Sequence, residues 1–138
     1  MLAGLMGAAL PAPASGQSFK WWQSERFQQE LVLSTDQIDR LEEIFQAKQP
    51  VLRRQKHALD RLEEALSAMV ADGQAGEAEA EALIDQVEAA RSTLGKSRTL
   101  MLFKMRRILT SDQHVKMKVL GEQWERERRN RGGRHLHQ

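Results

Sequence analysis

The stretch Leu33-Ser34-Thr35-Asp36-Gln37 recurs as Leu109-Thr110-Ser111-Asp112-Gln113, and each copy stands at the start of an amphipathic helical stretch. In each copy a Ser or Thr can act as N-cap, its oxygen accepting a hydrogen bond from a free backbone N–H. The Gln three residues later can bond back to the N–H of the cap, which completes a capping box. Capping boxes are common, so each copy alone can be an ordinary cap. Two copies in one small chain predict two helix starts.

Apolar residues follow the first copy at alternating intervals of three and four residues, the pattern of a coiled-coil seam. A second stretch with the same alternation begins after residues 72–76, which contain two glycines. The apolar seam positions are Ile38, Leu41, Phe45, Leu52, Leu59, Leu62, Leu66 and Met69, then Ala80, Leu83, Val87, Ala90, Leu94, Met101 and Ile108. Polar residues interrupt the seam at Lys48 and Gln55 in the first stretch and at Ser97 and Lys104 in the second. Because Gly favours chain reversal, the two stretches are predicted to form a long antiparallel αα-hairpin, with Leu59 near Ala90.

The composition favours an all-α fold. Of the 138 residues, 29% are charged and only 5% are aromatic, which is typical of long helices. A chain of this length forms one domain with a small core. It contains no cysteine, which excludes a disulfide framework and thiolate metal ligands.

Two short helices are predicted to flank the hairpin, which makes four helices in all. One lies within residues 19–31, and the other follows Gln113 and ends in the charged residues 125–129. Pro50 stands inside the first long helix, where its ring removes a backbone hydrogen bond. That helix is therefore expected to bend or to restart at Pro50.

The distribution of charge and apolar residues predicts a curved antiparallel homodimer. Residues 100–103 are all apolar and need cover on several sides, which a second subunit can provide. Residues 63–90 hold eight acidic side chains and no Lys or Arg, whereas residues 48–61 and 91–107 are strongly basic. Two hairpins lying in opposite directions would bring unlike charges together.

The N-terminal residues predict export. Residues 1–14 contain an apolar run followed by the small-x-small pattern of Ala12 and Ala14, as in a cleaved signal peptide. No Lys or Arg precedes the run, and the segment could instead be the end of a membrane anchor. The predicted organisation is a signal peptide over residues 1–14, a helical domain over 15–129 and a disordered basic, His-containing tail over 130–138.

With these pieces in place, the chain resembles the Spy/CpxP family of bacterial periplasmic proteins, whose signature is a pair of LTxxQ motifs. Leu109, Thr110 and Gln113 match the motif fully, and Leu33, Ser34 and Gln37 match it with Ser in place of Thr. The likeness extends from about residue 21 to residue 129. It implies a cradle-shaped antiparallel dimer that acts as an ATP-independent chaperone for unfolded periplasmic proteins in envelope stress.

The chaperone interpretation needs cations among apolar side chains, which would attract acidic client segments and hold them weakly. The candidates are Arg53, Arg54, Lys56, Arg61, Arg98, Met101, Met105 and Arg106. Methionine suits variable partners because its thioether chain is flexible and polarizable. A methionine at a seam position is also ordinary core, and that alternative stays open.

The alternative function is a periplasmic metal sensor that regulates an envelope signalling system, because ZraP-like and CnrX-like relatives bind divalent ions. The weak ligand candidates are His114 and Met117, one turn apart, and His135 and His137 in the tail. The first short helix offers no histidine, so the pattern of such a sensor is not reproduced. No cofactor is expected to be required, and zinc or another divalent metal is the one conceivable ligand.

Catalysis is not expected, because the chain has no cysteine nucleophile, Gly-rich phosphate loop or His-Glu-x-x-His pair. The arginines of residues 126–134 could bind phosphates nonspecifically, but export disfavours a nucleic-acid partner. A signalling kinase remains a possible partner through the family resemblance. No transmembrane span is expected beyond the N-terminal run.

Overall fold

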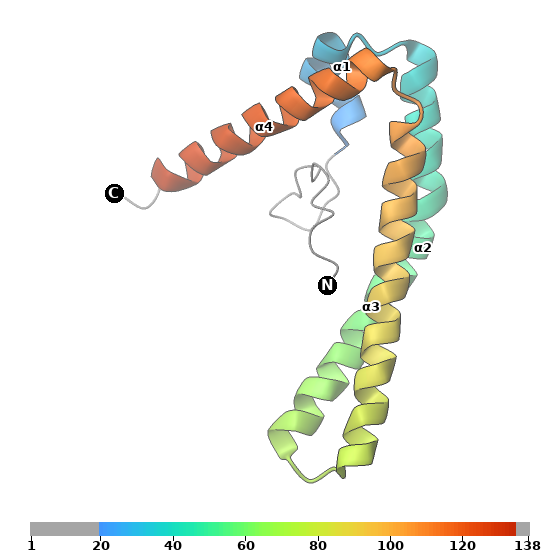
Figure 1. Ribbon diagram of the computed structural model, residues 1–138, viewed down its shortest axis with the longest axis vertical. Coiled ribbons are helices and arrows are strands. Elements are labelled where there is room, and N and C mark those ends of the chain that lie inside the picture. The colour runs from blue at the N-terminus through green and yellow to red at the C-terminus, as the bar shows by residue number, and fades with distance from the viewer. Residues whose placement is uncertain (1–19, 135–138) are drawn as a thin grey trace. The chain divides into compact units, whose positions relative to one another are not determined.

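The computed structural model describes residues 20–134 and shows an all-α chain (Figure 1). A 3-10 helix, η1 (Trp21–Gln23), is followed by α1 (Glu25–Leu31), α2 (Thr35–Asp72), α3 (Glu77–Arg106) and α4 (Ser111–Arg134). No strand occurs within this described part, so the predicted fold class of four α-helices is confirmed. The chain divides into two compact units, which are unit 1 (Met1–Leu41 and Ile108–Gln138) and unit 2 (Glu42–Arg107).

The N-terminal expectation is not tested, because the signal peptide proposed for residues 1–14 lies outside the described residues. Among residues 20–134, no helix has the run of apolar side chains that a bilayer span requires. The predicted disordered tail is wrong for residues 130–134, which belong to α4. The remainder, residues 135–138, is again outside the described part.

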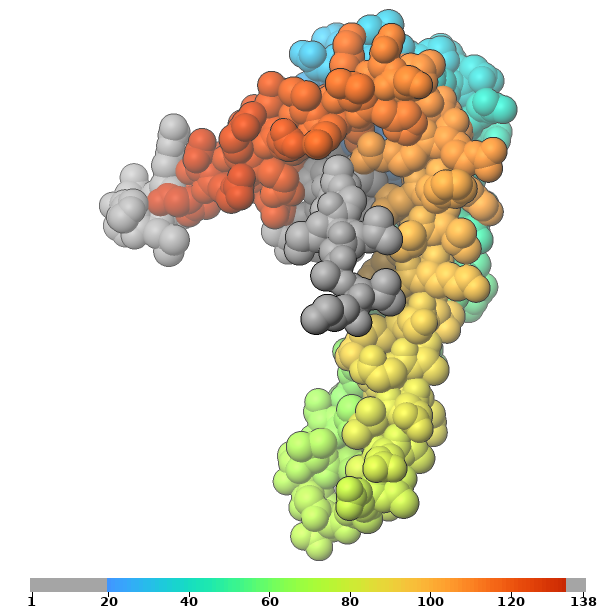
Figure 2. Space-filling view, viewed as in Figure 1, coloured from blue at the N-terminus to red at the C-terminus, as the bar shows by residue number. Residues whose placement is uncertain are grey.

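Unit 2 consists of α3 packed beside the larger part of α2 (Figure 1 and Figure 2). Its core holds Leu59, Val87 and Leu94, which are at most 7% exposed. The half-buried residues packed against this core are Leu52, Leu62, Leu66 and Ala90. Leu59 and Ala90 therefore belong to one cluster, as the seam pattern predicts.

The segment between α2 and α3 reverses the chain where the glycines are. Gly73 has a φ of 67°, a left-handed conformation that costs other residues free energy, and its N–H donates to the Met69 carbonyl at 3.0 Å. Gly76 is the N-cap of α3 in an extended conformation. The sequence left open whether the first long helix bends or restarts at Pro50. A restart is wrong, because α2 runs without interruption through Pro50.

Unit 1 packs α1 against η1 and α4. Its buried aromatic residues are Trp21, Trp22 and Phe27, and the two indole rings meet edge to face with centroids 5.7 Å apart. The single short helix predicted within residues 19–31 is in fact two pieces. Ser24 separates them, because its extended backbone ends η1 while its carbonyl accepts the Gln28 N–H at the start of α1.

The last helix is longer than predicted, because α4 has 24 residues and continues past the charged stretch in which it was expected to end. The charges stabilise it. Arg26 of α1 donates to both carboxylate oxygens of Glu127, at 2.9 and 3.1 Å. Arg128 pairs with Glu125 one turn back at 3.4 Å and stacks over the Trp124 ring at 5.4 Å.

The Arg26–Glu127 pair has an electrostatic signature. The hydrogen bonds from Arg26 lower the pKa of the Glu127 carboxyl below its ordinary value of 4.5, and the same bonds raise the pKa of Arg26. Since both groups are exposed to solvent, the pair orients α4 against α1 more than it stabilises unit 1.

Val32 sits in a left-handed conformation at the end of α1, with φ 52° and ψ 53°. This backbone is unfavourable for a β-branched residue, and the Val32 side chain is 72% exposed and so gains little from packing. Replacing Val32 with Gly is expected to raise the free energy of unfolding by about 1 kcal/mol, measured by urea denaturation. The control Val115→Gly, at an exposed helical position, should lower it. A destabilised Val32→Gly variant would contradict the strain argument.

Candidate functional site

Both capping boxes that the sequence predicts are present in unit 1. The Ser34 Oγ accepts the Gln37 N–H at 3.1 Å, and the Ser34 N–H donates to Gln37 Oε1 at 3.1 Å. At the second motif, Thr110 Oγ1 accepts the Gln113 N–H at 3.2 Å, and the Thr110 N–H donates to Gln113 Oε1 at 2.9 Å. Each glutamine thus caps the helix in which it lies.

The two glutamines also bond to each other. Gln37 Nε2 donates to Gln113 Oε1 at 2.8 Å, and Gln113 Nε2 donates to Gln37 Oε1 at 3.0 Å. The amides reach backbone carbonyls as well, from Gln37 to Ile108 at 3.0 Å and from Gln113 to Leu31 at 3.0 Å. We call this arrangement the glutamine pair. It joins the starts of α2 and α4 to the end of α1.

Burial makes the glutamine pair consequential for stability. Gln113 is only 8% exposed, so its amide depends on protein partners rather than on water. Of the motif leucines, Leu109 is buried and Leu33 is half-buried. The sequence predicts the two caps separately but does not predict that they meet. The one available signal is the repetition itself, since two identical amides can pair reciprocally.

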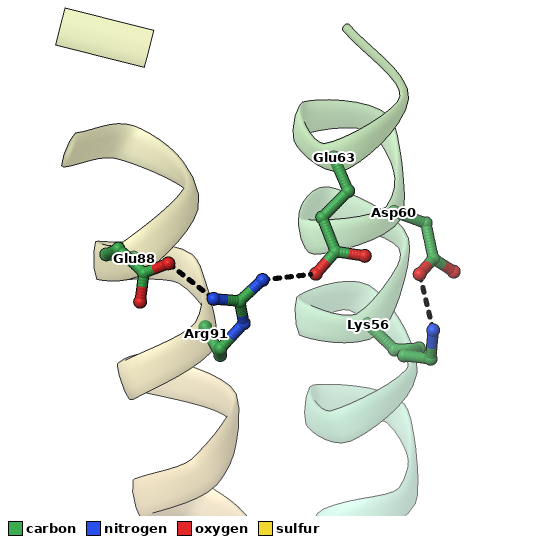
Figure 3. Close-up of polar contacts among 5 residues, drawn as sticks. All are labelled: Lys56, Asp60, Glu63, Glu88 and Arg91. Carbon is green, nitrogen blue, oxygen red and sulfur yellow. Dashed lines mark hydrogen bonds and ion pairs between the residues drawn. The ribbon is translucent and has the colours of Figure 1, made fainter. Parts of the chain in front are cut away.

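The predicted client-binding residues fall into two groups. Arg53, Arg54, Lys56, Arg61 and Arg98 are exposed, and Lys56 pairs with Asp60 one turn later (Figure 3). The prediction is wrong for Met105, which is 2% exposed and belongs to the core, the alternative that the seam pattern left open. Met101 is half-buried. Arg106 is also half-buried, and desolvation lowers the pKa of its guanidinium.

A different face of α3 carries the exposed apolar residues. Lys96, Leu100, Phe103 and Arg107 follow one another at intervals of four, three and four residues, so they share one face of the helical path. Leu100 is 44% exposed and Phe103 is 58% exposed. The Arg107 guanidinium lies 5.7 Å from the centroid of the Phe103 ring. We call these four residues the outer stripe.

The sequence already contains the signal for the outer stripe. Residues 100–103 are apolar all round, so a helix that buries one side of them must expose the other. Leu94 and Met105, each 2% exposed, lie on the buried side of α3. The outer stripe therefore lies in the same segment of α3 as Arg98, Met101 and Arg106, but on another side of the helix.

Of the four metal-ligand candidates, only His114 and Met117 lie within the described residues. Met117 is 2% exposed and His114 is half-buried, whereas His135 and His137 lie outside the described residues. Within the described part of the chain, no group of three or more His, Cys, Asp or Glu side chains is placed to hold a metal ion. Met117, like Met105, is therefore a methionine of the buried core.

Ion pairs cover only a part of the acidic region, residues 63–90. Arg91, just beyond it, pairs with Glu88 on α3 and with Glu63 on α2, the latter at 3.0 Å (Figure 3). Both bonds raise the pKa of the Arg91 guanidinium, and the hydrogen bond that Arg91 donates to Glu63 has the larger effect. The other six carboxylates of residues 63–90 make no ion pair within residues 20–134.

The described surface thus offers exposed cations and apolar side chains, which suit non-covalent binding of a partner chain. No model of a known protein family, no curated protein and no solved structure matches this chain. A functional conclusion therefore depends on the chemistry of the surface and on the motif resemblance.

Proposed function

We propose that the chain is a periplasmic, ATP-independent chaperone that binds unfolded or aggregation-prone proteins. The α2 and α3 helices would form the arms of an antiparallel homodimer, as the resemblance to the Spy/CpxP family implies. The observation that carries this proposal is the outer stripe, in which two large apolar side chains of α3 are exposed between Lys96 and Arg107, the residue that follows α3.

The outer stripe suits transient binding. Cations attract acidic client segments over about a Debye length, roughly 10 Å at moderate salt. Leu100 and Phe103 then contribute apolar contact, which is non-directional and does not select one sequence. Complete burial of such a side chain is worth about 1.5–3 kcal/mol, and these two are already partly buried, so each gains less. Binding of this strength is reversible without ATP.

An aggregation assay tests the proposal. The full chain, at a stoichiometric amount, is mixed with a client protein that aggregates on dilution from denaturant, and light scattering is recorded without nucleotide. We expect suppression of scattering that neither ATP nor zinc changes. Absence of suppression would contradict the chaperone function. If the chain also took up stoichiometric zinc, the metal sensor would be favoured instead.

A further inference from the structure

One face of α4 is left exposed by the described residues of its own unit. It contains Val115, Val119, Glu122, Arg126 and Arg129, which recur at helical spacing. Val115 is 67% exposed and Val119 is 48% exposed. Beyond Glu125 every residue through Gly133 is exposed. Arg126 and Arg129 make no ion pair within the described residues.

A face of α3 in unit 2 has the complementary chemistry. Ile84 is 44% exposed and lies on one helical stripe with Glu77 and Glu81, which are exposed and make no ion pair within residues 20–134. Carboxylates four residues apart on a helix repel each other, and a cationic partner would relieve that repulsion. We call this stripe the acidic α3 face.

The two faces have matching spacings. On α4, seven residues separate Val119 from Arg126, and on α3 seven residues separate Glu77 from Ile84. Seven residues are about two helical turns, or roughly 10.5 Å along the axis. If the helices run antiparallel with Val119 on Ile84, Arg126 comes opposite Glu77. In a parallel arrangement, Arg126 would come opposite Arg91 and be repelled.

From this match we infer that the α4 face binds the acidic α3 face of a second copy of the chain. This deepens the proposed function, because it rests on the homodimer and names the surfaces that form it. The apolar pair at the centre excludes water, while the flanking charges select the antiparallel orientation. In a two-fold dimer the contact occurs twice.

A charge swap tests the inference in the full chain. The variants are Arg126→Glu and Glu77→Lys. Each alone is expected to raise the dissociation constant of the dimer about tenfold or more in analytical ultracentrifugation, because like charges then face each other at both copies of the contact. A one-to-one mixture of the two variants should restore dimers, since both contacts again pair unlike charges. Circular dichroism checks that each variant keeps its helices.

Two further variants sharpen the test. Glu122 is the one carboxylate on the α4 face and would lie near Glu81, so Glu122→Gln should lower the dissociation constant a few-fold. Arg40→Glu is the matched control, because it reverses one exposed charge of α2 outside both faces and should leave the constant unchanged. About 0.5 M NaCl should raise the dissociation constant of the wild-type dimer, because salt screens the charge pairs. The control variant should respond to salt as the wild type does.

The outcomes separate this inference from the chaperone function. If the wild type is a dimer and neither swap variant weakens it, the inference is overturned and the homodimer stands. If mixing the variants fails to restore dimers while the arginine variant alone loses binding to phosphatidylglycerol vesicles, α4 binds lipid and the inference is likewise overturned. Restored dimers without suppression of aggregation would support the docking surface and contradict the chaperone function.

Discussion

Replacing Gln113 with Ala is expected to lower the free energy of unfolding by about 2–4 kcal/mol, the largest stability effect that we predict. The substitution removes a cap from α4 and a donor from the Leu31 carbonyl, and it takes away the partner of Gln37. Gln113 is 8% exposed, so water replaces these bonds poorly. Urea denaturation followed by circular dichroism measures the change.

The control for Gln113 is Gln46→Ala. Gln46 is an exposed glutamine of α2 whose side chain bonds only to Glu42 one turn back, at 2.8 Å, and its loss should cost no more than about 0.5 kcal/mol. A double-mutant cycle with Gln37→Ala then isolates the glutamine pair, and we expect a coupling energy of about 1 kcal/mol or more. Additive effects of Gln37→Ala and Gln113→Ala would show that the two caps act independently.

Replacing both Leu100 and Phe103 with Ser is expected to reduce suppression of client aggregation about tenfold, because the outer stripe then loses its apolar contacts with the client. Both side chains are exposed, so the free energy of unfolding should change little. The matched control is Val70→Ser, which removes an exposed apolar side chain of α2 that lies outside the outer stripe and is 72% exposed. Equal suppression by all three proteins would remove the outer stripe as the client site.

Local chemistry made the helix starts and the seam predictable. A Ser or Thr followed three residues later by Gln defines a helix start from four residues alone, and the structure places α2 and α4 directly after Ser34 and Thr110. The seam alternation likewise predicted that Leu59 and Ala90 belong to one core, because the spacing of apolar residues in each stretch marks the side that faces the other helix. These features depend on residues close together in sequence.

Features that depend on distant partners were missed or wrong. The helix α4 continues through residue 134, and within it Glu127 accepts hydrogen bonds from Arg26 of α1, which is 101 residues away in the sequence. The glutamine pair joins side chains 76 residues apart. Met105 was assigned to the client surface because a seam pattern alone does not distinguish a core methionine from one at a binding face.

Direct binding to an unfolded protein tests the central claim. The full chain is titrated into a fluorescently labelled client that has been reduced and carboxymethylated so that it cannot refold, and anisotropy is recorded without nucleotide or added metal. We predict saturable binding with a dissociation constant of about 1–50 μM, which the Leu100→Ser, Phe103→Ser variant weakens and the Val70→Ser control does not. Absence of binding to the unfolded client at about 100 μM chain would contradict the chaperone function.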